Sequence, residues 1–595
     1  MTAKTEPAAP TTPASPATPA SEDADAVLRR ADALLAQRRL WENHWQELAD
    51  YVLPRRSDIV VARAQGDKHG EKLFDGTAPH ANELLAAALH GMLTNPASRW
   101  FELGLVGVEE SDLDGAARDW LQAATDALID AFGESNLATQ LHELYLDLGC
   151  FGTGCLYLDE TDGRLRFSTR SLSEVAVAED AFGRIDTVFR RFAFSARQAA
   201  QQFGTEALGP KPREALTRDP DRPFSFVHAV FPRADATGGT TVAGGRLPFA
   251  SLYVCVDDRC VVSRGGYHEF PWMVPRWSKA TAEVYGRSPA MGVLPDIKML
   301  NEMARTTLKA AQKAVDPPLM MPDDGFVGQI RTAPGAVNYY RAGLLERIET
   351  LPFRGDVALG LQMEDRRRAP IRSAFFVDQL QLAEGPSMTA TEVLQRTEEK
   401  LRMMGPMLGR LQNELLRPLI GRAFAILARA GRIPEAPKVL KRLGGRIEVD
   451  YVSPIARAQR GEEAGAMTRV AQAIQPFVAA NPELLDLVDA ERLLRHVAAR
   501  FGVPRGIVRD DNAVARFRRD RRKAMEATMA AMTGGAMPGG PPPDGEPSDG
   551  PPRAAGPVPG PVSSGEPPGA GGATDPILAA LTNGAMAPRR GSPRR

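Results

Sequence analysis

SPAMGVLPDIKMLNEMARTTLKAAQKAVDPP, residues 288–318, is the stretch of sequence that decides the fold. Pro289 stands in the first turn of the helix that this stretch predicts, where a missing backbone N–H does no harm. Asp316-Pro317-Pro318 ends the helix, because proline cannot continue it. The sequence therefore predicts a helix over residues 289–315, which at 1.5 Å per residue would span roughly 40 Å.

Two stripes of side chains run along this predicted helix. One is mostly basic and falls at i, i+4, i+7, i+11 and i+15, namely Lys298, Glu302, Arg305, Lys309 and Lys313. The other is apolar and lies beside it, namely Leu294, Ile297, Ala304, Leu308 and Ala311. In a single chain the basic stripe would be the side that faces water. In a ring of such helices it would face a central channel or the neighbouring subunits.

Upstream of this helix, the hydrophobic periodicity predicts four amphipathic helices and then a sheet. The helices are expected from Ser21 to just before Pro54, at 77–94, at 112–132 and at 136–148. Between Cys155 and Lys279 the segments become short and rich in aromatic and β-branched residues, with turn residues between them. This pattern predicts an antiparallel sheet subdomain with one inserted helix at 195–203.

Downstream, the chain is predicted to be irregular over 316–354 and helical again to about Leu382, with a kink or a new helix start at Pro370. Thr389 and Glu392 form a capping box that opens a long helix to Gly431, which Gly405-Pro406 and Pro418 should kink or break. Two or three helices are expected over 480–533. The fold class is therefore α+β, mainly helical.

The two ends of the chain have the composition of disordered segments. Proline recurs every third residue near the N-terminus, and 29 of the 62 residues from 534 to 595 are Pro or Gly, too many for a packed domain. One apolar island, residues 577–581, is either a docking segment or a plain spacer.

Composition narrows the class of protein. The chain has 595 residues, enough for three or four domains, and its 73 Lys and Arg balance 74 Asp and Glu. Without a basic surplus, a DNA partner would be guided loosely and not gripped. The sequence contains no run of about 18 apolar residues, so we expect no membrane-spanning helix. Four cysteines are too few for a disulfide framework in so long a chain, which fits a reducing intracellular compartment.

No motif in the sequence carries a recognisable reaction. The chain has no Gly-Lys dipeptide, hence no phosphate loop of the GxxxxGK[ST] form, and no GxSxG or HExxH. GCFGTG, residues 149–154, is either a tight helix-to-strand turn or a phosphate loop, and its order favours the turn. The pairs Cys150/Cys155 and Cys255/Cys260 are either zinc ligands or small buried side chains. We therefore expect no cofactor, no metal and no enzymatic activity.

Basic residues also gather outside the 289–315 helix. They form Arg366-Arg367-Arg368 and a run from Arg516 to Lys523. The second run alternates with acidic residues, so it is either a solvated helical face or a DNA-binding surface.

Several segments, in order, resemble the portal proteins of short-tailed bacteriophages, the head-to-tail connecting family. They are RLWENHW at 39–45, YVLP at 51–54, LFDGTA at 73–78, Asn95-Pro96, Trp100-Phe101, FGTG at 151–154, VYGRSPA at 284–290, LPDIK at 294–298, DPP at 316–318 and MTATEV at 388–393. No single segment is diagnostic, but their order and spacing extend over residues 25–530.

The resemblance implies a ring of twelve subunits with parts named wing, stem, clip and crown. Carried onto this sequence, the wing is 22–287, with a long kinked helix and a wing return at 389–480. The stem helices are 288–315 and 355–380, the clip is 316–354 and the crown is 481–533. A loop at 381–388, with Gly385 and Pro386, would project into the channel. The tails, 1–21 and 534–595, lie outside the resemblance.

The resemblance also implies partners and a location. The partners are further copies of the chain, double-stranded DNA bound without sequence reading, the terminase large subunit, a tail adaptor protein and the major capsid protein, and no membrane. The location is the portal vertex of the virion, with the host cytoplasm during assembly. The DNA-channel candidates are Lys298, Arg305, Lys309, Lys313, Gly385 and Pro386.

From the residues alone, other functions stay open. The chain could be another capsid-associated structural protein that forms no channel, or a DNA-processing enzyme built from dispersed acidic residues. The charges of the basic stripe could also serve only to pair with neighbouring stem helices.

Overall fold

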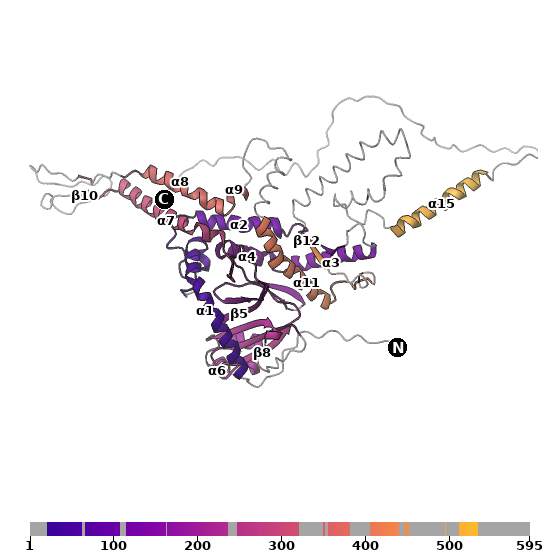
Figure 1. Cartoon of the computed structure of the whole chain (residues 1–595), viewed down its shortest axis with the longest axis horizontal. Helices are drawn as coiled ribbons and strands as arrows, with labels where there is room; N and C mark the ends of the chain where they lie inside the picture. The colour runs from indigo at the N-terminus through magenta and orange to yellow at the C-terminus, as the bar shows by residue number, and fades with distance from the viewer. Residues whose placement is uncertain are drawn as a thin grey trace, which may run out of the picture. The chain divides into compact units, whose positions relative to one another are not determined.

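The computed structural model describes residues 21–61, 66–107, 115–161, 163–235, 247–320, 349–350, 355–380, 405–437, 440, 447–451, 494 and 511–533. The chain divides into two compact units, residues 1–516 and 517–595. Of the second unit, the structure describes only the end of helix α15 (Asp511–Thr533). The folded core described below belongs to the first unit (Figure 1).

Four helices build the first layer of this core, as the periodicity predicted. They are α1 (Ser21–Val52), α2 (Thr77–Leu93), α3 (Gly115–Gly133) and α4 (Leu137–Phe151), with a short 3-10 turn, η1 (Pro54–Arg56), after α1. Helix α4 is central, because every residue from Leu144 to Phe151 is buried. Trp45 and Leu48 of α1 and Leu85 and Leu89 of α2 join it in one large apolar cluster.

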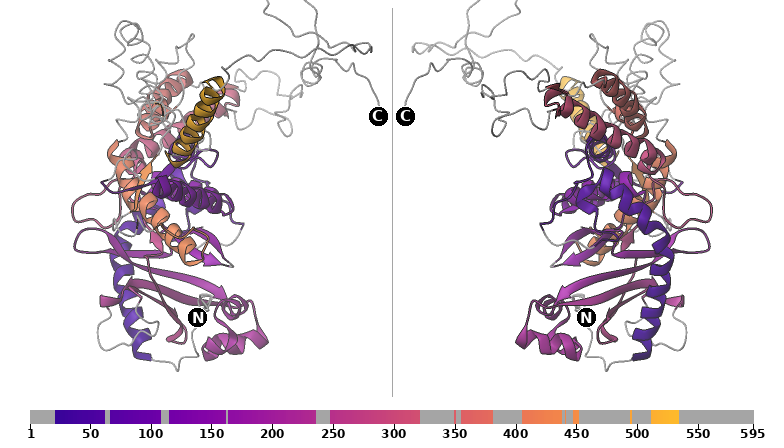
Figure 2. Two further views of the ribbon diagram at one scale, coloured as in Figure 1. Left: turned by 90° about the vertical axis from the view of Figure 1, so that its right-hand side faces the viewer. Right: turned by 90° about the vertical axis from the view of Figure 1, so that its left-hand side faces the viewer.

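The middle of the chain forms antiparallel sheets, as predicted. Three strands pair in the order β3 (Arg164–Thr169), β2 (Leu156–Thr161), β9 (Trp272–Met273). Five strands pair in the order β4 (Val175–Glu179), β5 (Ile185–Ser195), β6 (Pro223–Pro232), β7 (Phe249–Cys255), β8 (Cys260–Tyr267). A further pair joins β1 (Phe101–Leu105) to β12 (Ile447–Tyr451). Helix α1 runs beside the five-stranded sheet, and its Val27 and Leu28 share a cluster with Phe231 and Leu252 (Figure 2).

The expectation of one inserted helix in the sheet was wrong, because two helices lie there. Helix α5 (Ala196–Phe203) was predicted, and Ser195 with Gln198 forms a capping box at its start. Helix α6 (Pro210–Arg218) was missed. Its two prolines, Pro210 and Pro212, lie in its first turn, where a helix tolerates proline. Only Pro212 and Ala215 of α6 are buried, so its periodic signal is weak. The 3-10 turns η3 (Thr205–Ala207) and η4 (Arg233–Asp235) complete this region.

The glycines of residues 149–154 form the predicted turn between α4 and β2. Gly152 caps α4 with φ +77°, and its N–H donates to the carbonyl of Leu148. A Cβ atom on Gly152 would lie 2.5 Å from the Ser288 nitrogen, so the chain entering α7 (Pro289–Val315) fills the space in front of this turn. Ser288 Oγ donates to the Cys150 carbonyl at 2.8 Å and accepts from the Met291 N–H at 3.1 Å. The turn therefore fixes the start of α7.

The second stem segment differs in detail from its prediction. Of the two outcomes predicted at Pro370, a kink or a new helix start, the new start is wrong, because helix α8 (Val357–Ala374) continues through this residue. The chain breaks instead at Phe376, which adopts φ +59° before α9 (Val377–Leu380). Phe375 is fully buried and Val377 nearly so, so packing of these apolar side chains accounts for the position of the break.

The long helix predicted to run to Gly431 is described from Gly405 onward. Residues 405–411 are helical, a π-helical turn follows at Gln412–Leu416, and α11 (Arg417–Arg429) continues without a gap. Pro418 lies in the first turn of α11 directly after the π turn, at a position where a kink or a break was predicted, and the helix is distorted there but not broken. Gly431 ends the helix with φ +70°, as predicted. The capping box of Thr389 and Glu392 lies outside the described residues.

Little of the predicted clip, crown and tails lies within the described residues. The clip contributes the two-residue strands β10 (Leu319–Met320) and β11 (Glu349–Thr350), which pair with each other. The crown contributes Leu494 and α15, whose described side chains are mostly exposed. Among the described residues, no helix is long and apolar enough to cross a membrane.

Replacing Gly152 with Ala should destabilise the fold by about 2–4 kcal/mol, because a side chain there meets both a positive φ and the backbone of residues 286–288. Gly91→Ala is the matched control, since Gly91 lies within α2 and a Cβ atom added there would have no neighbour within 4 Å. It should raise stability by about 0.5–1 kcal/mol. Chemical unfolding of both variants measures the difference, and equal stability of the two would contradict the role of Gly152.

Candidate functional site

Helices α7 and α8 lie side by side and antiparallel, and we call them, with β10 and β11, the α7–α8 arm (Figure 1). Arg367 of α8 pairs with Asp296 of α7 at 2.8 Å. Farther along, Gly360 faces Thr307, whose Oγ1 would lie 2.9 Å from a Cβ on that glycine. Leu319 and Thr350 are strand partners at the far end. The arm is therefore one hairpin from its first turn to the strands.

The arm is anchored by polar contacts to the loop before α2, and we call this anchor the root. Asn301 is 3% exposed, and its Oδ1 accepts from the Phe74 N–H at 2.7 Å and the Asp75 N–H at 3.2 Å. Its Nδ2 donates to the Lys72 carbonyl at 2.5 Å. From α8, Arg368 pairs with Asp75 at 2.8 Å. Both helices thus hold the same short loop, residues 72–75.

The negative charge of the Asp75 carboxylate contributes to the root through its contacts with Thr77 and Arg368. Burial alone would raise the pKa of its carboxyl, but hydrogen bonds from Thr77 and Arg368 outweigh burial and lower the pKa below the ordinary value. The Thr77 N–H donates to Asp75 Oδ1 at 2.8 Å. The contact therefore stabilises the folded state at neutral pH, and this contribution is lost as the pH falls through the lowered pKa.

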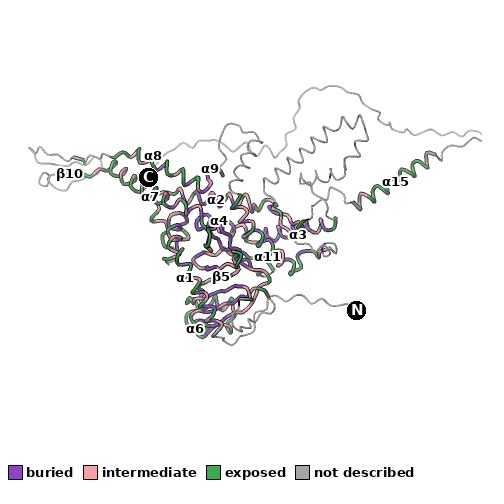
Figure 3. The backbone as a smooth tube through the Cα atoms, in the orientation of Figure 1, coloured by how far each residue is buried: buried purple, intermediate pink, exposed green. Residues whose placement is uncertain are grey.

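The apolar stripe of α7 is buried at the root and exposed toward the strands. Leu294 and Ile297 are 5% and 4% exposed. On the same face, Leu308 is 52% and Val315 is 87% exposed. Helix α8 matches this change, because Leu359 and Met363 are about half exposed whereas Ile371 is fully buried. Figure 3 shows the exposed colour along the outer lengths of both helices. The subunit itself leaves this apolar surface in water.

The four basic candidates on α7 fall into two groups. Lys298 pairs with Glu47 of α1 at 3.3 Å. Arg305 pairs with Glu302 at 3.4 Å and lies over the Phe74 ring, 5.5 Å from its centroid. Lys309 and Lys313 are exposed, and neither makes an ion pair or hydrogen bond to any described residue. Lys298 and Arg305 therefore have partners within the subunit, whereas Lys309 and Lys313 have none among the described residues. Gly385 and Pro386 lie outside the described residues.

The root was not anticipated from the sequence, nor was a second buried ionic cluster. Arg276, 2% exposed, pairs with Glu179 at the end of β4 and with Glu414 in the π-helical turn, the latter at 2.7 Å. These ion pairs raise the Arg276 pKa against the opposing effect of burial. A single arginine between Pro275 and Trp277 gave no sequence signal, because its partners are 97 and 138 residues away.

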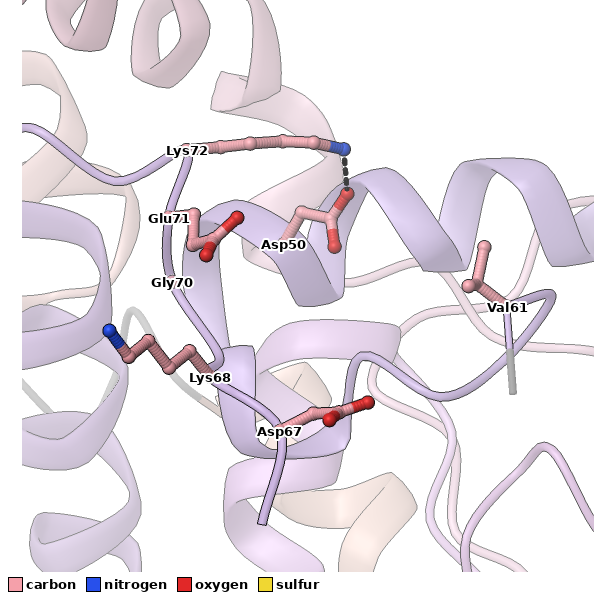
Figure 4. A pocket seen from close by; sticks show the side chains of 7 residues that line it. All are labelled: Asp50, Val61, Asp67, Lys68, Gly70, Glu71 and Lys72. Atoms are coloured by element: carbon pink, nitrogen blue, oxygen red, sulfur yellow. Dashed lines mark hydrogen bonds and ion pairs between the residues drawn. The ribbon is translucent and has the colours of Figure 1, made fainter. Parts of the chain in front are cut away.

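A hollow of about 520 Å³ lies at the loop between α1 and α2 (Figure 4). It is open, and seven residues line it: Asp50, Val61, Asp67, Lys68, Gly70, Glu71 and Lys72. Lys72 pairs with Asp50 at 2.6 Å across its edge. This lining contains no serine, cysteine or histidine nucleophile, so the hollow offers no nucleophile–base pair.

The four cysteines are buried and free, as expected of small core side chains. Within the described part of the chain, no three His, Cys, Asp or Glu residues gather as metal ligands.

Comparison with known proteins identifies the family. The family described as "Bacteriophage head to tail connecting protein" matches residues 24–508. The chain belongs to this family. It is 31% identical over 515 residues to the "Probable portal protein" of Bordetella phage BPP-1, covering 85% of this chain and 92% of the relative. It is 29% identical over 455 residues to the portal protein of Salmonella phage epsilon15, covering 74% of this chain and 81% of the relative.

Solved structures of gene transfer agent (GTA) particles also match. The neck of the native GTA particle with C12 symmetry covers 67% of this chain and 87% of its own, with 14% identity and a TM-score of 0.32. The virion of the native particle covers 67% and 86%, with 14% identity and a TM-score of 0.31. At these TM-scores the match adds nothing to the assignment, which rests on the family and the two relatives.

Membership of the head-to-tail connecting family confirms the resemblance seen in the sequence. The chain is a structural protein of the phage virion, in a family of head–tail connectors and portal proteins. The described residues combine helices with antiparallel sheets, so the α+β class is also confirmed.

Replacing Arg368 with Gln should lower the free energy of unfolding by about 1.5–3 kcal/mol at neutral pH, because Asp75 would keep its charge and lose its guanidinium partner. Arg367→Gln is the matched control, since its pair with Asp296 is more exposed and worth less than about 1 kcal/mol. The Arg368 effect should shrink in acid, where Asp75 is protonated. Equal effects of the two substitutions at every pH would contradict the role of the root.

Proposed function

We propose that the chain forms a ring of twelve subunits at one capsid vertex. The ring is the conduit through which double-stranded DNA enters the head and leaves it. It also docks the terminase large subunit during packaging and a tail adaptor protein afterwards, and the major capsid protein surrounds it. Family membership supports the general role, and the exposed apolar stripe of the α7–α8 arm is the single observation that carries the ring.

The apolar stripe supports contact between identical subunits. Ile297, Leu308 and Val315 follow one face of α7, and the subunit covers only the first of them. A monomer that exposed the others would leave about 1.5–3 kcal/mol of burial energy per side chain unused. A neighbouring arm in a closed ring would cover them, because a heterologous contact repeated by rotation satisfies every subunit alike.

The basic stripe supports a role facing DNA. Successive residues of a helix lie about 100° apart around its axis, so Lys309 and Leu308 face different directions. If the apolar stripe meets a neighbouring subunit, the lysines turn toward another surface, which we assign to the channel. Lys309 and Lys313 have no partner within the described subunit, so they are free to meet phosphates. Weak, salt-dependent phosphate contacts would centre a duplex of any sequence without holding it.

The contacts within the subunit support a smaller set of channel residues than the sequence suggested. Lys298 pairs with Glu47 of α1 and Arg305 lies over Phe74 of the root loop, so pairing between neighbours is not needed to satisfy them. In our proposal these two residues hold the arm, and Lys309 and Lys313 face the DNA. Gly385 and Pro386, in the proposed tunnel loop 381–388, would form the narrowest part of the channel.

The remaining parts keep the boundaries carried over from the family. The wing would be 22–287 with a return over 389–480, and the stem would be α7 and α8. The clip would begin at β10 and end after β11, which places the terminase and adaptor docking surface at the end of the arm away from the root. The crown would be 481–533.

Replacing Leu308 and Val315 together with Glu should abolish the ring, because twelve pairs of charges would be buried between subunits. Native mass spectrometry is the measurement, with circular dichroism to confirm that each subunit stays folded. Lys309→Glu with Lys313→Glu is the control, since it introduces the same charges on the neighbouring face of the helix and should leave the ring intact. Intact rings of the Leu308/Val315 variant would refute the proposed contact.

Replacing Lys309 and Lys313 with Gln should leave assembly unchanged and alter the passage of DNA. We expect changed packaging efficiency or retention in an in vitro packaging assay, with a weaker dependence on salt. Lys298→Gln with Arg305→Gln is the matched pair on the same stripe; because these side chains already have partners within the subunit, it should leave packaging unchanged and cost less than about 1 kcal/mol of stability per ion pair. If both pairs leave packaging unchanged at every salt concentration, the stripe has no channel role.

A further inference from the structure

Cys255 and Cys260 face each other across the hairpin of β7 and β8. Cys255 is the last residue of β7, Cys260 is the first of β8, and the two are direct partners in the antiparallel register. The two thiols lie close enough to shift each other's pKa, up for Cys255 and down for Cys260. The turn between them, residues 256–259, is tight enough to hold Arg259 at φ +49°. These are two thiols in contact at the tip of a hairpin, not one isolated cysteine.

This geometry suits a disulfide without movement of the backbone. Directly opposed residues of an antiparallel pair have Cα atoms about 4.5–5.5 Å apart. Disulfides occur at Cα separations of about 4.4–6.8 Å, so the register places the pair within the required range.

The two thiols differ in their environment. Cys255 is fully buried, whereas Cys260 keeps 9% of its surface exposed, which gives a small oxidant a route to its sulfur. The interaction between the two thiols lowers the pKa of Cys260 and raises that of Cys255. Because an oxidant reaches only the exposed sulfur and the thiolate is the reacting form, we take Cys260 as the nucleophile of the pair.

We propose that Cys255 and Cys260 are an oxidisable pair that hydrogen peroxide converts to a disulfide across the β7–β8 hairpin. The Cys260 thiolate attacks one peroxide oxygen, the O–O bond breaks, and a sulfenic acid forms with release of hydroxide. The Cys255 sulfur then attacks the Cys260 sulfur, the S–O bond breaks, and the hydroxyl leaves as water with the Cys255 proton. In total, two thiols and one peroxide give one disulfide and two waters.

The disulfide would close the turn at residues 256–259, which contacts β6, α6 and α1. The Asp257 carboxylate accepts from the Ser225 N–H of β6 at 2.9 Å, and the Asp258 carboxylate accepts from the Lys211 N–H of α6 at 3.0 Å. Arg259 pairs with Asp25 of α1 at 2.7 Å. A disulfide would therefore hold the turn that ties α1 and α6 to the sheet once a particle leaves a reducing cell.

The other two cysteines provide an internal control. Cys150 is the residue before the last of α4 and Cys155 precedes β2, and both are fully buried. Burial raises the pKa of both thiols, so neither is a good nucleophile. We expect both to stay reduced under conditions that oxidise the hairpin pair.

The sequence makes the test direct. Trypsin cuts after Arg246, Arg259 and Arg264, so Cys255 falls in the peptide 247–259 and Cys260 in the peptide 260–264. A disulfide joins them at two hydrogen masses below the sum of the two peptides and is broken by reduction, whereas a missed cleavage after Arg259 joins them at one water mass below that sum and survives reduction. Cys150 and Cys155 share a single peptide, 119–164. The folded full-length protein is treated with hydrogen peroxide, free thiols are blocked with iodoacetamide in denaturant, and the non-reduced digest is analysed by mass spectrometry.

We expect the linked peptide 247–259/260–264 to form, to lose two hydrogen masses relative to its parts, and to separate on reduction, while peptide 119–164 carries two blocked thiols. A linked peptide that arises only from disulfide-bonded dimers on a non-reducing gel would overturn the proposal. So would sulfinic acid at Cys260 without linkage, or equal oxidation of all four cysteines.

Two substitutions distinguish the proposed order of reaction, Cys260 first and Cys255 second, from independent oxidation of each accessible thiol. With Cys260→Ser, Cys255 should remain reduced, because it loses the partner that reacts first. With Cys255→Ser, Cys260 should still react but proceed to sulfinic acid, because no second thiol resolves it. If either variant fails to fold, the wild-type peptide map still decides. Rapid oxidation of Cys255 in a folded Cys260→Ser protein would show that Cys260 is not the nucleophile.

Discussion

The contact between the end of α4 and the start of α7 is the constraint on which the rest of the structure depends. Gly152 turns left-handed at the end of a fully buried helix, and Ser288 binds the Cys150 carbonyl while capping α7. Thr153 Oγ1 accepts from the Gly286 N–H at 2.8 Å in the same junction. Residues more than 130 apart in sequence thus share one set of backbone contacts. Because a helix is stiff, fixing its first turn fixes the direction of the whole α7–α8 arm.

Within the described residues, the outer half of α7 keeps its apolar side chains exposed, as Leu308 and Val315 show. Two free energies can be compared here. An exposed ion pair is worth about 0–1 kcal/mol, whereas burying one large apolar side chain is worth about 1.5–3 kcal/mol. In the proposed ring, Leu308 and Val315 would therefore contribute more to association than Lys309 and Lys313. The lysines would then remain for a partner that must be bound weakly, so that α7 would serve assembly with one face and DNA with another.

Much of the fold could be predicted from local signals. The bounds of α7 follow from Ser288, Pro289 and Asp316, and the turn at Gly152 follows from the glycine order, because caps and helix stops act over a few residues. Helix α6 and the break at Phe376 could not be predicted in the same way. The first is too short to show a period, and the second is set by which aromatic ring the core accepts.

In the candidate site, too, the features set by neighbouring residues could be predicted, and those set by residues far apart in the sequence could not. The two stripes of α7 were visible in the sequence, because their residues share one helix. The root was not, because Asn301 and Arg368 meet a loop more than 220 residues upstream. This difference changes the function of the stripe: Lys298 and Arg305 have the spacing of channel residues but the contacts of an anchor. Spacing alone places a charge on a helix face, and only the partners within reach determine whether it remains available to DNA.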